Sequence, residues 1–198
     1  MDILILVTSV VEKCVLLSLL GLSIWSIAII IDRRRALKGE GQFDFVGLKS
    51  TLVARDWRRA RELCSANAGI VASSLGAALS TMGSPEQIDR AVASQYKEER
   101  MQLEKGLAVL ATLGANAPFI GLFGTVLGII RAFAYLGAQS GSSSVMSGVS
   151  QALYATAAGL FVAIPAVVAF NTFSKKLKDL QMQVESLKDL YISRLPGE

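Results

Sequence analysis

The sequence predicts an all-α integral membrane protein with three transmembrane helices, a helical cytoplasmic domain, and long helices that extend from the membrane into the cytoplasm. Apolar residues make up 52% of the 198 residues and charged residues only 18%, whereas a soluble domain carries about a quarter charged residues. The missing charge is concentrated in three uncharged stretches, 14–31, 106–130 and 149–173. Each is long enough to cross the roughly 30 Å hydrocarbon core as a helix. None has the wide polar face that a soluble bundle would need.

The first span, residues 14–31, follows a short segment, 1–13, that is predicted to be an external amphipathic lead-in. The apolar side chains of this lead-in recur at helical spacing and are Ile3, Leu6, Val7, Val10 and Cys14. Glu12 and Lys13 are expected to anchor the helix at the external face of the membrane. Three arginines at 33–35 follow the span, which is the reverse of the charge order in a cleaved signal peptide.

The cytoplasmic segment, residues 32–105, is predicted to be helical. Residues 42–66 have the mixed pattern of one or two short amphipathic helices, with Trp57 as a packing anchor. The small, apolar residues 70–82 are compatible with a further helix.

A clear helix start follows at Ser84 and Pro85. Serine can cap a helix, proline suits the first helical position, and Gln87 completes a capping box. From there no helix breaker appears before Pro118. The sequence therefore predicts one unbroken helix that runs from the cytoplasm into the second span, residues 106–136.

The rest of the chain is predicted to form a short external loop at 137–148, a third span at 149–173 and a cytoplasmic C-terminal helix at 174–198. The last helix carries an apolar stripe at steps of three and four, made of Leu177, Leu180, Val184, Leu187 and Tyr191. This stripe is expected to pack on the helices of the cytoplasmic segment or on a neighbouring copy.

Basic residues set the expected topology. Lysines and arginines follow the first span at 33–38, precede the second at Lys105 and follow the third at 175–178, whereas the segment 137–150 has no charge. The positive-inside rule therefore puts the N-terminus outside and the C-terminus in the cytoplasm.

Composition also excludes several function classes. The net charge is +4, but the surplus lies beside the spans, where it suits anionic lipid rather than nucleic acid. Two cysteines without histidine make no metal site, and no cofactor is indicated. The chain offers no nucleophile–base pair, so an enzyme is not expected. The glycines of GLFGTVLG, residues 121–128, lack the lysine of a phosphate-binding loop.

Small residues recur on one face of the second and third spans. Such residues let helix backbones approach closely in lipid. The positions expected to serve helix packing and oligomerisation are Gly114, Gly121, Gly124 and Gly128 in the second span, and Gly148, Ala152, Gly159 and Ala163 in the third.

Two hydroxyls on or beside these faces, Thr125 and Thr156, suggest a hydroxyl-lined ion path. A single membrane threonine commonly bonds to its own backbone instead, and that alternative stays open for each. Weaker candidates for the same path are Gln151, Asn116 and Ser147.

Pro118 and Pro165 are expected to kink their helices and to free one backbone carbonyl each. The second and third spans contain no Asp, Glu, Lys or His, although proton relays through membranes normally use carboxylates or histidine. If the chain conducts protons, a partner must supply the carboxylate.

Residues 117–128, APFIGLFGTVLG, and 151–171, QALYATAAGLFVAIPAVVAFN, resemble the ExbB/TolQ family, with MotA as a more distant relative. The resemblance implies a homopentamer in the bacterial inner membrane. Its second and third spans would line a pore around a single-span ExbD- or TolR-like partner with an intramembrane Asp. Energy transduction would then couple proton flow, driven by the proton motive force, to mechanical work at the cell envelope, as in protein transport.

Thr125 and Thr156 match the two pore threonines of that family, whereas Gln151 stands where the family commonly has Glu. Alternatives from other classes remain open on the sequence alone. These are a non-conducting structural membrane scaffold, a MotA-like or gliding-type stator subunit, and a self-sufficient solute transporter.

Overall fold

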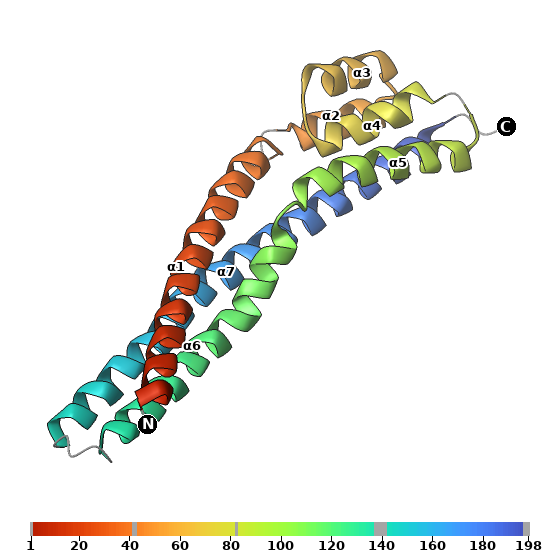
Figure 1. Cartoon of the computed structure of the whole chain (residues 1–198). Coiled ribbons are helices and arrows are strands. Elements are labelled where there is room, and N and C mark those ends of the chain that lie inside the picture. Colours follow the sequence, from red (N-terminus) through yellow and green to blue (C-terminus); the bar gives the residue numbers. More distant parts are fainter. Residues whose placement is uncertain (1, 41–42, 82, 137–141, 196–198) are drawn as a thin grey trace. The chain divides into compact units, whose positions relative to one another are not determined.

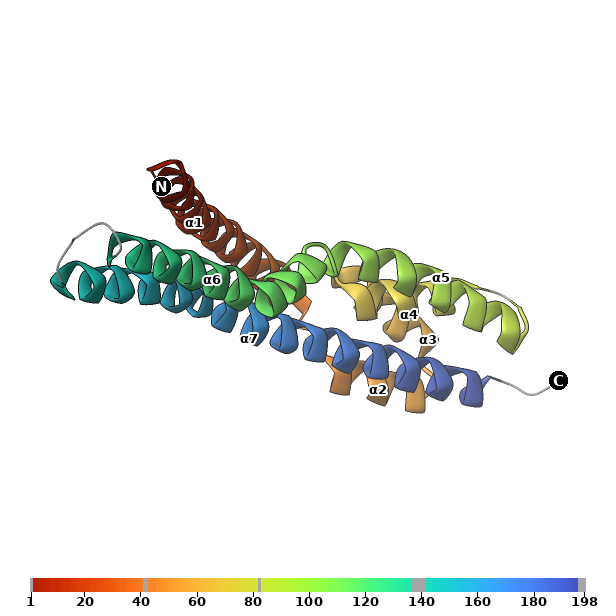
Figure 2. The same cartoon turned by 60° about the horizontal axis from the view of Figure 1, so that its bottom comes forward.

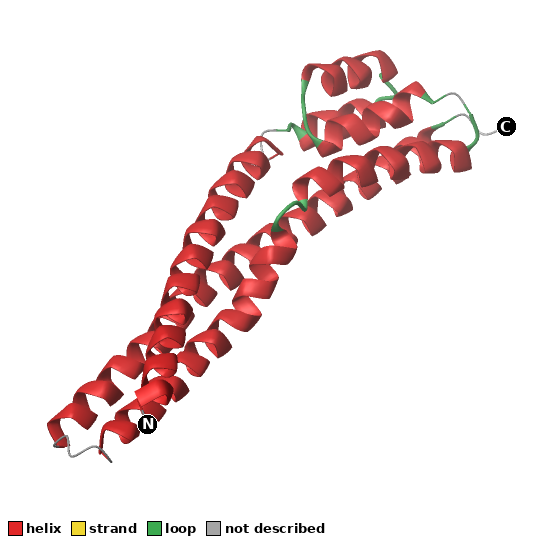
Figure 3. Cartoon of the chain, viewed as in Figure 1, coloured by secondary structure: helices red, strands yellow, loops and turns green. Residues whose placement is uncertain are grey.

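The computed structural model describes residues 2–40, 43–81, 83–136 and 142–195. In these ranges the chain forms α-helices joined by short turns (Figure 3). The helices, labelled in Figure 1, are α1 (Asp2–Gly39), α2 (Phe45–Val53), α3 (Trp57–Ala66), α4 (Ile70–Ser80), α5 (Pro85–Leu103), α6 (Leu107–Leu136) and α7 (Ser142–Arg194). The chain divides into two compact units. The membrane unit comprises Met1–Ile31 and Gly106–Asn171, and the polar unit comprises Asp32–Lys105 and Thr172–Glu198.

Three of the helices are long and apolar enough to cross a membrane, which confirms the predicted fold class. The stretches long and apolar enough to cross lie within Leu6–Gly39 of α1, Leu107–Ala134 of α6 and Val145–Arg194 of α7. Inside the membrane unit, α6 and the first half of α7 run side by side in both views (Figures 1 and 2).

Helix α1 is continuous from Asp2 to Gly39, so residues 2–13 and the first span form one helix, and an external lead-in at 1–13 stays a prediction. Leu6, Val7 and Val10 are exposed, whereas Glu12 and Val15 are buried. The physical reason is the solvent. In a bilayer the apolar face of a helix turns to lipid, so the few polar side chains are the ones that turn inward.

The core of the membrane unit joins all three spans. Val15 and Leu19 of α1 pack with Ala117 of α6 and with Val162 and Ala163 of α7. Ala117 is fully buried, and Leu19 is 1% exposed. Small side chains on α6 and α7 thus leave room for larger ones from α1.

The predicted unbroken helix from Ser84 into the second span is wrong. Helix α5 ends at Leu103 and α6 begins at Leu107, with a turn between them (Figure 3). Gly106 has a φ of +77° in this turn, a conformation that glycine adopts without the steric cost of a Cβ. Pro118, the first helix breaker that the sequence pattern indicates, lies inside α6.

Helix α7 also begins earlier than predicted. It starts at Ser142 and continues to Arg194, so it includes much of the segment that the sequence placed in an external loop. Residues 137–141 of that loop lie outside the described residues. The expected helical continuation after the third span is confirmed as part of the same helix.

The polar unit contains the two short helices expected in 42–66, namely α2 and α3, and the further helix α4. Asp44 caps α2 by accepting from the Gly47 N–H at 2.8 Å, and Asp56 caps α3 by accepting from Arg59 at 3.0 Å. Helix α4 packs against α3 and α5. The predicted start of α5 is confirmed, with the Ser84 N–H donating to Gln87 Oε1 at 3.0 Å.

The apolar stripe of the C-terminal helix packs within the polar unit of the same chain. Its members Leu177, Leu180, Val184, Leu187 and Tyr191 are all buried. The ring of Tyr191 meets that of Trp57 edge to face, with centroids 5.3 Å apart. Trp57 is therefore the packing anchor that the sequence indicated.

Candidate functional site

The contact between α6 and α7 in the membrane unit is built from positions without large side chains. A Cβ on Gly121 would lie 2.6 Å from the Ala155 carbonyl oxygen and 3.0 Å from the Thr156 Cα. A Cβ on Gly159 would lie 2.6 Å from the Ala117 carbonyl oxygen. The two backbones touch here, as small residues permit in lipid.

The same close approach continues along both helices. Cβ atoms on the glycines would meet Ala155 from Gly124, Ala152 from Gly128, Ala132 from Gly148 and Val167 from Gly114. Ala163 lies in the core beside Leu19 of α1. These contacts join helices of one chain, and the expectation that the small residues also mediate oligomerisation stays a prediction.

The two threonines lie within about one helical turn of each other along the helix pair. The Cβ position of Gly124 is 2.7 Å from Ala155 Cβ, and Thr125 and Thr156 are the next residues along each helix. Thr125 is 6% exposed, and its hydroxyl donates to the Leu122 carbonyl at 2.7 Å. The local backbone bond that the sequence left open is therefore present at Thr125. Thr156 is half-buried.

Asn116 and Ser147 lie at other levels of the membrane unit. Asn116 is exposed on α6 and donates from Nδ2 to the Thr112 carbonyl at 2.9 Å. Ser147 is exposed near the start of α7. Pro118 and Pro165 lie inside α6 and α7, which continue past them. A kink at either proline remains a prediction.

Gln151 belongs to a charged cluster whose members lie on three different helices and far apart in the sequence. Its Oε1 accepts from Arg131 Nη2 at 3.0 Å, while Arg131 Nη1 lies 2.7 Å from Glu12 Oε2. The Arg131 and Glu12 side chains are only 12% and 4% exposed. The cluster joins all three spans near the end of the helix pair where α6 finishes and α7 begins.

A sequence signal for this cluster did exist. Arg131 is the only charged residue in 106–171, and Glu12 precedes the first uncharged stretch by two positions. The expected topology already put both on the external side of the membrane. An unpaired charge in a span is costly, so the two opposite charges could have been matched.

The membrane unit therefore presents two polar levels. One holds the ionic cluster of Glu12, Arg131 and Gln151. The other, five to six residues further along, holds the hydroxyls of Thr125 and Thr156, and a rise of ~1.5 Å per residue puts it roughly 7.5–9 Å away. A hydroxyl can donate one hydrogen bond and accept two, but it does not hold a proton as a carboxylate does.

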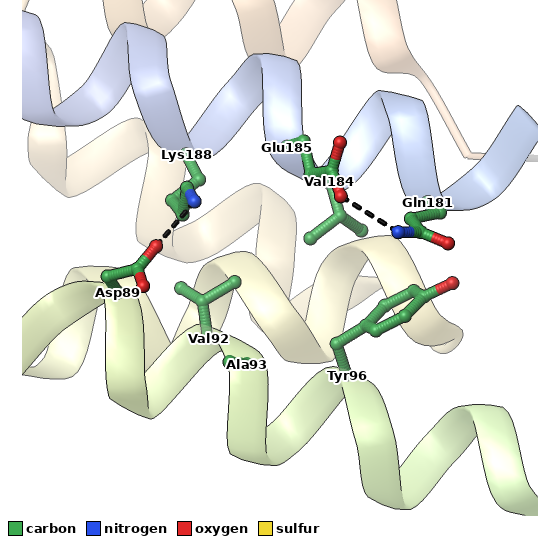
Figure 4. A pocket seen from close by; sticks show the side chains of 8 residues that line it. All are labelled: Asp89, Val92, Ala93, Tyr96, Gln181, Val184, Glu185 and Lys188. Carbon is green, nitrogen blue, oxygen red and sulfur yellow. Dashed lines mark hydrogen bonds and ion pairs between the residues drawn. The ribbon is translucent and has the colours of Figure 1, made fainter.

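The polar unit has a pocket of about 270 Å³ between α5 and α7 (Figure 4). Lys188 forms an ion pair with Asp89 there, and this hydrogen bond raises the lysine pKa. Gln181 Nε2 donates to Glu185 Oε1 at 2.9 Å. Asp89 and Lys188 neutralise one another, and the Glu185 carboxylate leaves the pocket wall with a formal charge of −1.

Comparison with known proteins identifies the family. The model of the MotA/TolQ/ExbB proton channel family matches residues 64–186. The chain is 51% identical over 92 residues to the biopolymer transport protein ExbB of Xanthomonas campestris pv. campestris strain B100, covering 46% of this chain and 36% of that protein.

Two further relatives come from other bacteria. The Tol-Pal system protein TolQ of Pseudomonas aeruginosa is 45% identical over 93 residues, covering 46% of this chain and 40% of that protein. ExbB of Neisseria gonorrhoeae is 46% identical over 98 residues, covering 48% and 44% of the two chains. The matched region spans less than half the length of these relatives.

The matched residues include α5, α6 and most of α7, and hence the glycine contacts, both threonines and the Arg131–Gln151 bond. The family model covers more than half of the chain. The resemblance noted in 117–128 and 151–171 is thus confirmed, and the chain belongs to the MotA/TolQ/ExbB proton channel family.

Proposed function

We propose that this chain is the channel-forming subunit of a motor in the bacterial inner membrane, driven by the proton motive force. Copies of the chain, a homopentamer, surround a single-span partner of the ExbD or TolR kind. The partner supplies an intramembrane Asp, and proton flow through the complex performs mechanical work at the cell envelope. Membership of a proton channel family supports this proposal.

The observation that carries the proposal is the level of the membrane unit that holds Thr125 and Thr156. It offers the hydroxyls of Thr125 and Thr156, and the only charged residue in 106–171, Arg131, is already paired with Glu12. The Thr125 hydroxyl donates a hydrogen bond to the Leu122 carbonyl oxygen, so its lone pairs remain able to accept hydrogen bonds from water. Hydroxyls can line a water path, but a proton carrier must come from a partner.

The surface of the membrane unit supports assembly with lipid and with other copies. Large apolar side chains are exposed on each span, among them Trp25, Phe119, Phe123, Leu153 and Phe161. A groove of about 460 Å³ between α1 and α7, lined by Leu19, Phe161 and Val162, adds apolar surface. Lipid tails and neighbouring copies are the partners that such a surface suits.

Proton uptake by proteoliposomes tests the proposal. The wild-type chain alone is expected to be tight to protons, and adding the single-span partner is expected to open the path. Thr156→Ala should slow partner-dependent uptake at least about tenfold, which corresponds to roughly 1.4 kcal/mol. Thr156→Ser, which keeps the hydroxyl, should have a mild effect.

Ser18→Ala is the matched control. Ser18 is an exposed residue on α1 whose hydroxyl donates to the Val15 carbonyl at 2.8 Å, so its loss should leave uptake unchanged. Vesicles with the chain alone that leak as fast as the full complex would show that the partner does not carry the proton. Equal uptake by Thr156→Ala and wild-type complexes would refute the hydroxyl path.

A further inference from the structure

The buried carboxylate of Glu12 has no role in the proton path described above. Glu12 is 3% exposed and lies in a helix that spans the membrane. Glu12 and Arg131 make the one ion pair among the described residues of the membrane unit. Glu12 Oε2 lies 2.7 Å from Arg131 Nη1 but receives no aligned hydrogen bond. The attraction is therefore mainly one of charge.

The neighbouring amide of Gln151 is oriented by the same arginine. Arg131 Nη2 donates to Gln151 Oε1 at 3.0 Å. A guanidinium has only donors, so the oxygen of the amide must be the atom that faces it. The Gln151 Nε2 donors then point elsewhere, and Gln151 is exposed in the single chain.

Without Glu12, the positive charge of Arg131 would have no carboxylate partner in this chain. Its Nη1 would be free, and in an apolar setting it would attract the nearest carboxylate strongly. A guanidinium beside a carboxylate favours the ionised form and opposes protonation. An uncompensated Arg131 could thus hold the partner's carboxylate in its charged state.

We propose that Glu12 is a positioning residue of the proton path. By neutralising Arg131, it keeps the guanidinium from capturing the membrane-embedded carboxylate of the partner, and it keeps the Gln151 N–H donors turned to the exposed side. This inference rests on the proposed function, since it assumes that a partner carboxylate passes this level.

The test uses Glu12→Gln in the full complex and two second-site changes. Glu12→Gln should slow partner-dependent proton uptake at least about tenfold. Adding Arg131→Gln removes the guanidinium that would bind the partner's carboxylate. Adding Gln151→Glu gives Arg131 a new carboxylate from α7. Each double variant should recover most of the uptake. Lys13→Gln, which removes the adjacent exposed charge, should leave uptake unchanged.

A second measurement, the melting temperature of the chain alone in nanodiscs, separates structure from positioning. Glu12→Gln should melt about 5 °C or more below the wild type, because breaking a buried pair leaves an unpaired charge, and both double variants should recover. Should the single variant fail to assemble, recovery of assembly and uptake in both double variants supports the proposal.

The opposing outcomes are distinct. Normal uptake by Glu12→Gln, even with a lower melting temperature, would show a structural ion pair only and overturn the proposal. Double variants that remain as slow as Glu12→Gln would also overturn it. Wild-type complexes that take up no protons would instead overturn the proposed function, and this inference with it.

Discussion

Glu40 caps a helix that it does not belong to. The residue before α4 is Gly69, which has no side chain to cap with, and its φ of +123° favours glycine. Glu40 Oε2 instead accepts from the Ile70 N–H at 2.8 Å. Burial raises the pKa of Glu40, and the hydrogen bond from Ile70 opposes this only in part.

The pH dependence of the polar unit follows from the raised pKa of Glu40. A carboxyl group whose pKa is higher in the folded state contributes stability below its unfolded pKa, near 4.5, and that stability is lost as the pH rises through the folded value. Glu40→Gln, which keeps an acceptor for Ile70 but cannot ionise, should flatten this dependence. We expect thermal melts at pH 5 and pH 8 to differ less for this variant than for the wild type.

Glu40→Ala is the contrasting change. It removes the acceptor and leaves a buried N–H without its partner, which costs about 1–3 kcal/mol at either pH. Hydrogen exchange at Ile70 should accelerate in Glu40→Ala and not in Glu40→Gln. Equal exchange in both variants would mean that Glu40 does not cap α4.

Sequence reasoning found individual site residues more readily than their contacts. Thr125 and Thr156 follow from the small-residue pattern, and the structure puts them within about one helical turn of each other. The ion pair of Glu12 with Arg131 did not follow, because the two residues lie on different helices and more than a hundred positions apart. A helical period describes one helix face, whereas a salt bridge between helices depends on their register and rotation.

The distance between α6 and α7 is set by glycines that pack directly against the backbone of the facing helix. Gly121 and Gly159 lie across from each other, with the Cβ position of Gly159 only 3.1 Å from Gly121 Cα. Any larger side chain must push the two helices apart. This makes the helix pair sensitive to single methyl groups.

Gly121→Ala should therefore destabilise the membrane unit by about 1–3 kcal/mol, the usual cost of overpacking. The added Cβ would lie 2.6 Å from the Ala155 oxygen, a backbone atom that cannot move alone. Gly21→Ala on α1 is the matched control, since nothing lies within 4 Å of its Cβ position. Alanine also favours the helix by roughly 1 kcal/mol over glycine.

Reversible unfolding of both variants in mixed micelles would measure the difference. We expect Gly121→Ala to unfold at a lower denaturant fraction than the wild type and Gly21→Ala at an equal or higher one. If the two variants unfold alike, the close approach of α6 and α7 at Gly121 is not a feature of the protein in solution.

At the level of helices, the sequence predicted type and number better than boundaries. Three spans follow from uncharged length, and α5 follows from its capping box. The turn between α5 and α6 was missed because Gly106 and Gly114 look alike in the sequence. Gly114 is helical, while Gly106 has a positive φ. Only the fold around a glycine decides which of the two conformations it adopts.

The composition of the polar unit bears on how the whole chain crosses the membrane. The segment after the first span and the segment after the third, Asp32–Lys105 and Thr172–Glu198, form one compact unit. Two segments that pack together must lie on the same side of a bilayer. The second and third spans lie between these segments, and two crossings return the chain to the side from which it started. The lysines and arginines of both segments favour the cytoplasmic side.

Thiol labelling of spheroplasts tests that orientation, and the choice of reporter matters. Cys64 is buried, and burial raises its pKa to about 11. Since the thiolate is the reactive form, Cys64 would stay unlabelled on either side of the membrane. A background of Cys14→Ser with Cys64→Ala is therefore needed, with Ser65→Cys as the reporter in the polar unit. Ser65 is exposed on α3, next to the native cysteine.

Ser142→Cys, where α7 begins, reports on the other side. An impermeant maleimide added to intact spheroplasts should label Ser142→Cys, and it should label Ser65→Cys at least about tenfold more slowly until detergent is added. The expected contrast follows because a charged reagent does not cross the bilayer. The reverse contrast would invert the topology and place the basic residues after the first and third spans outside the cell.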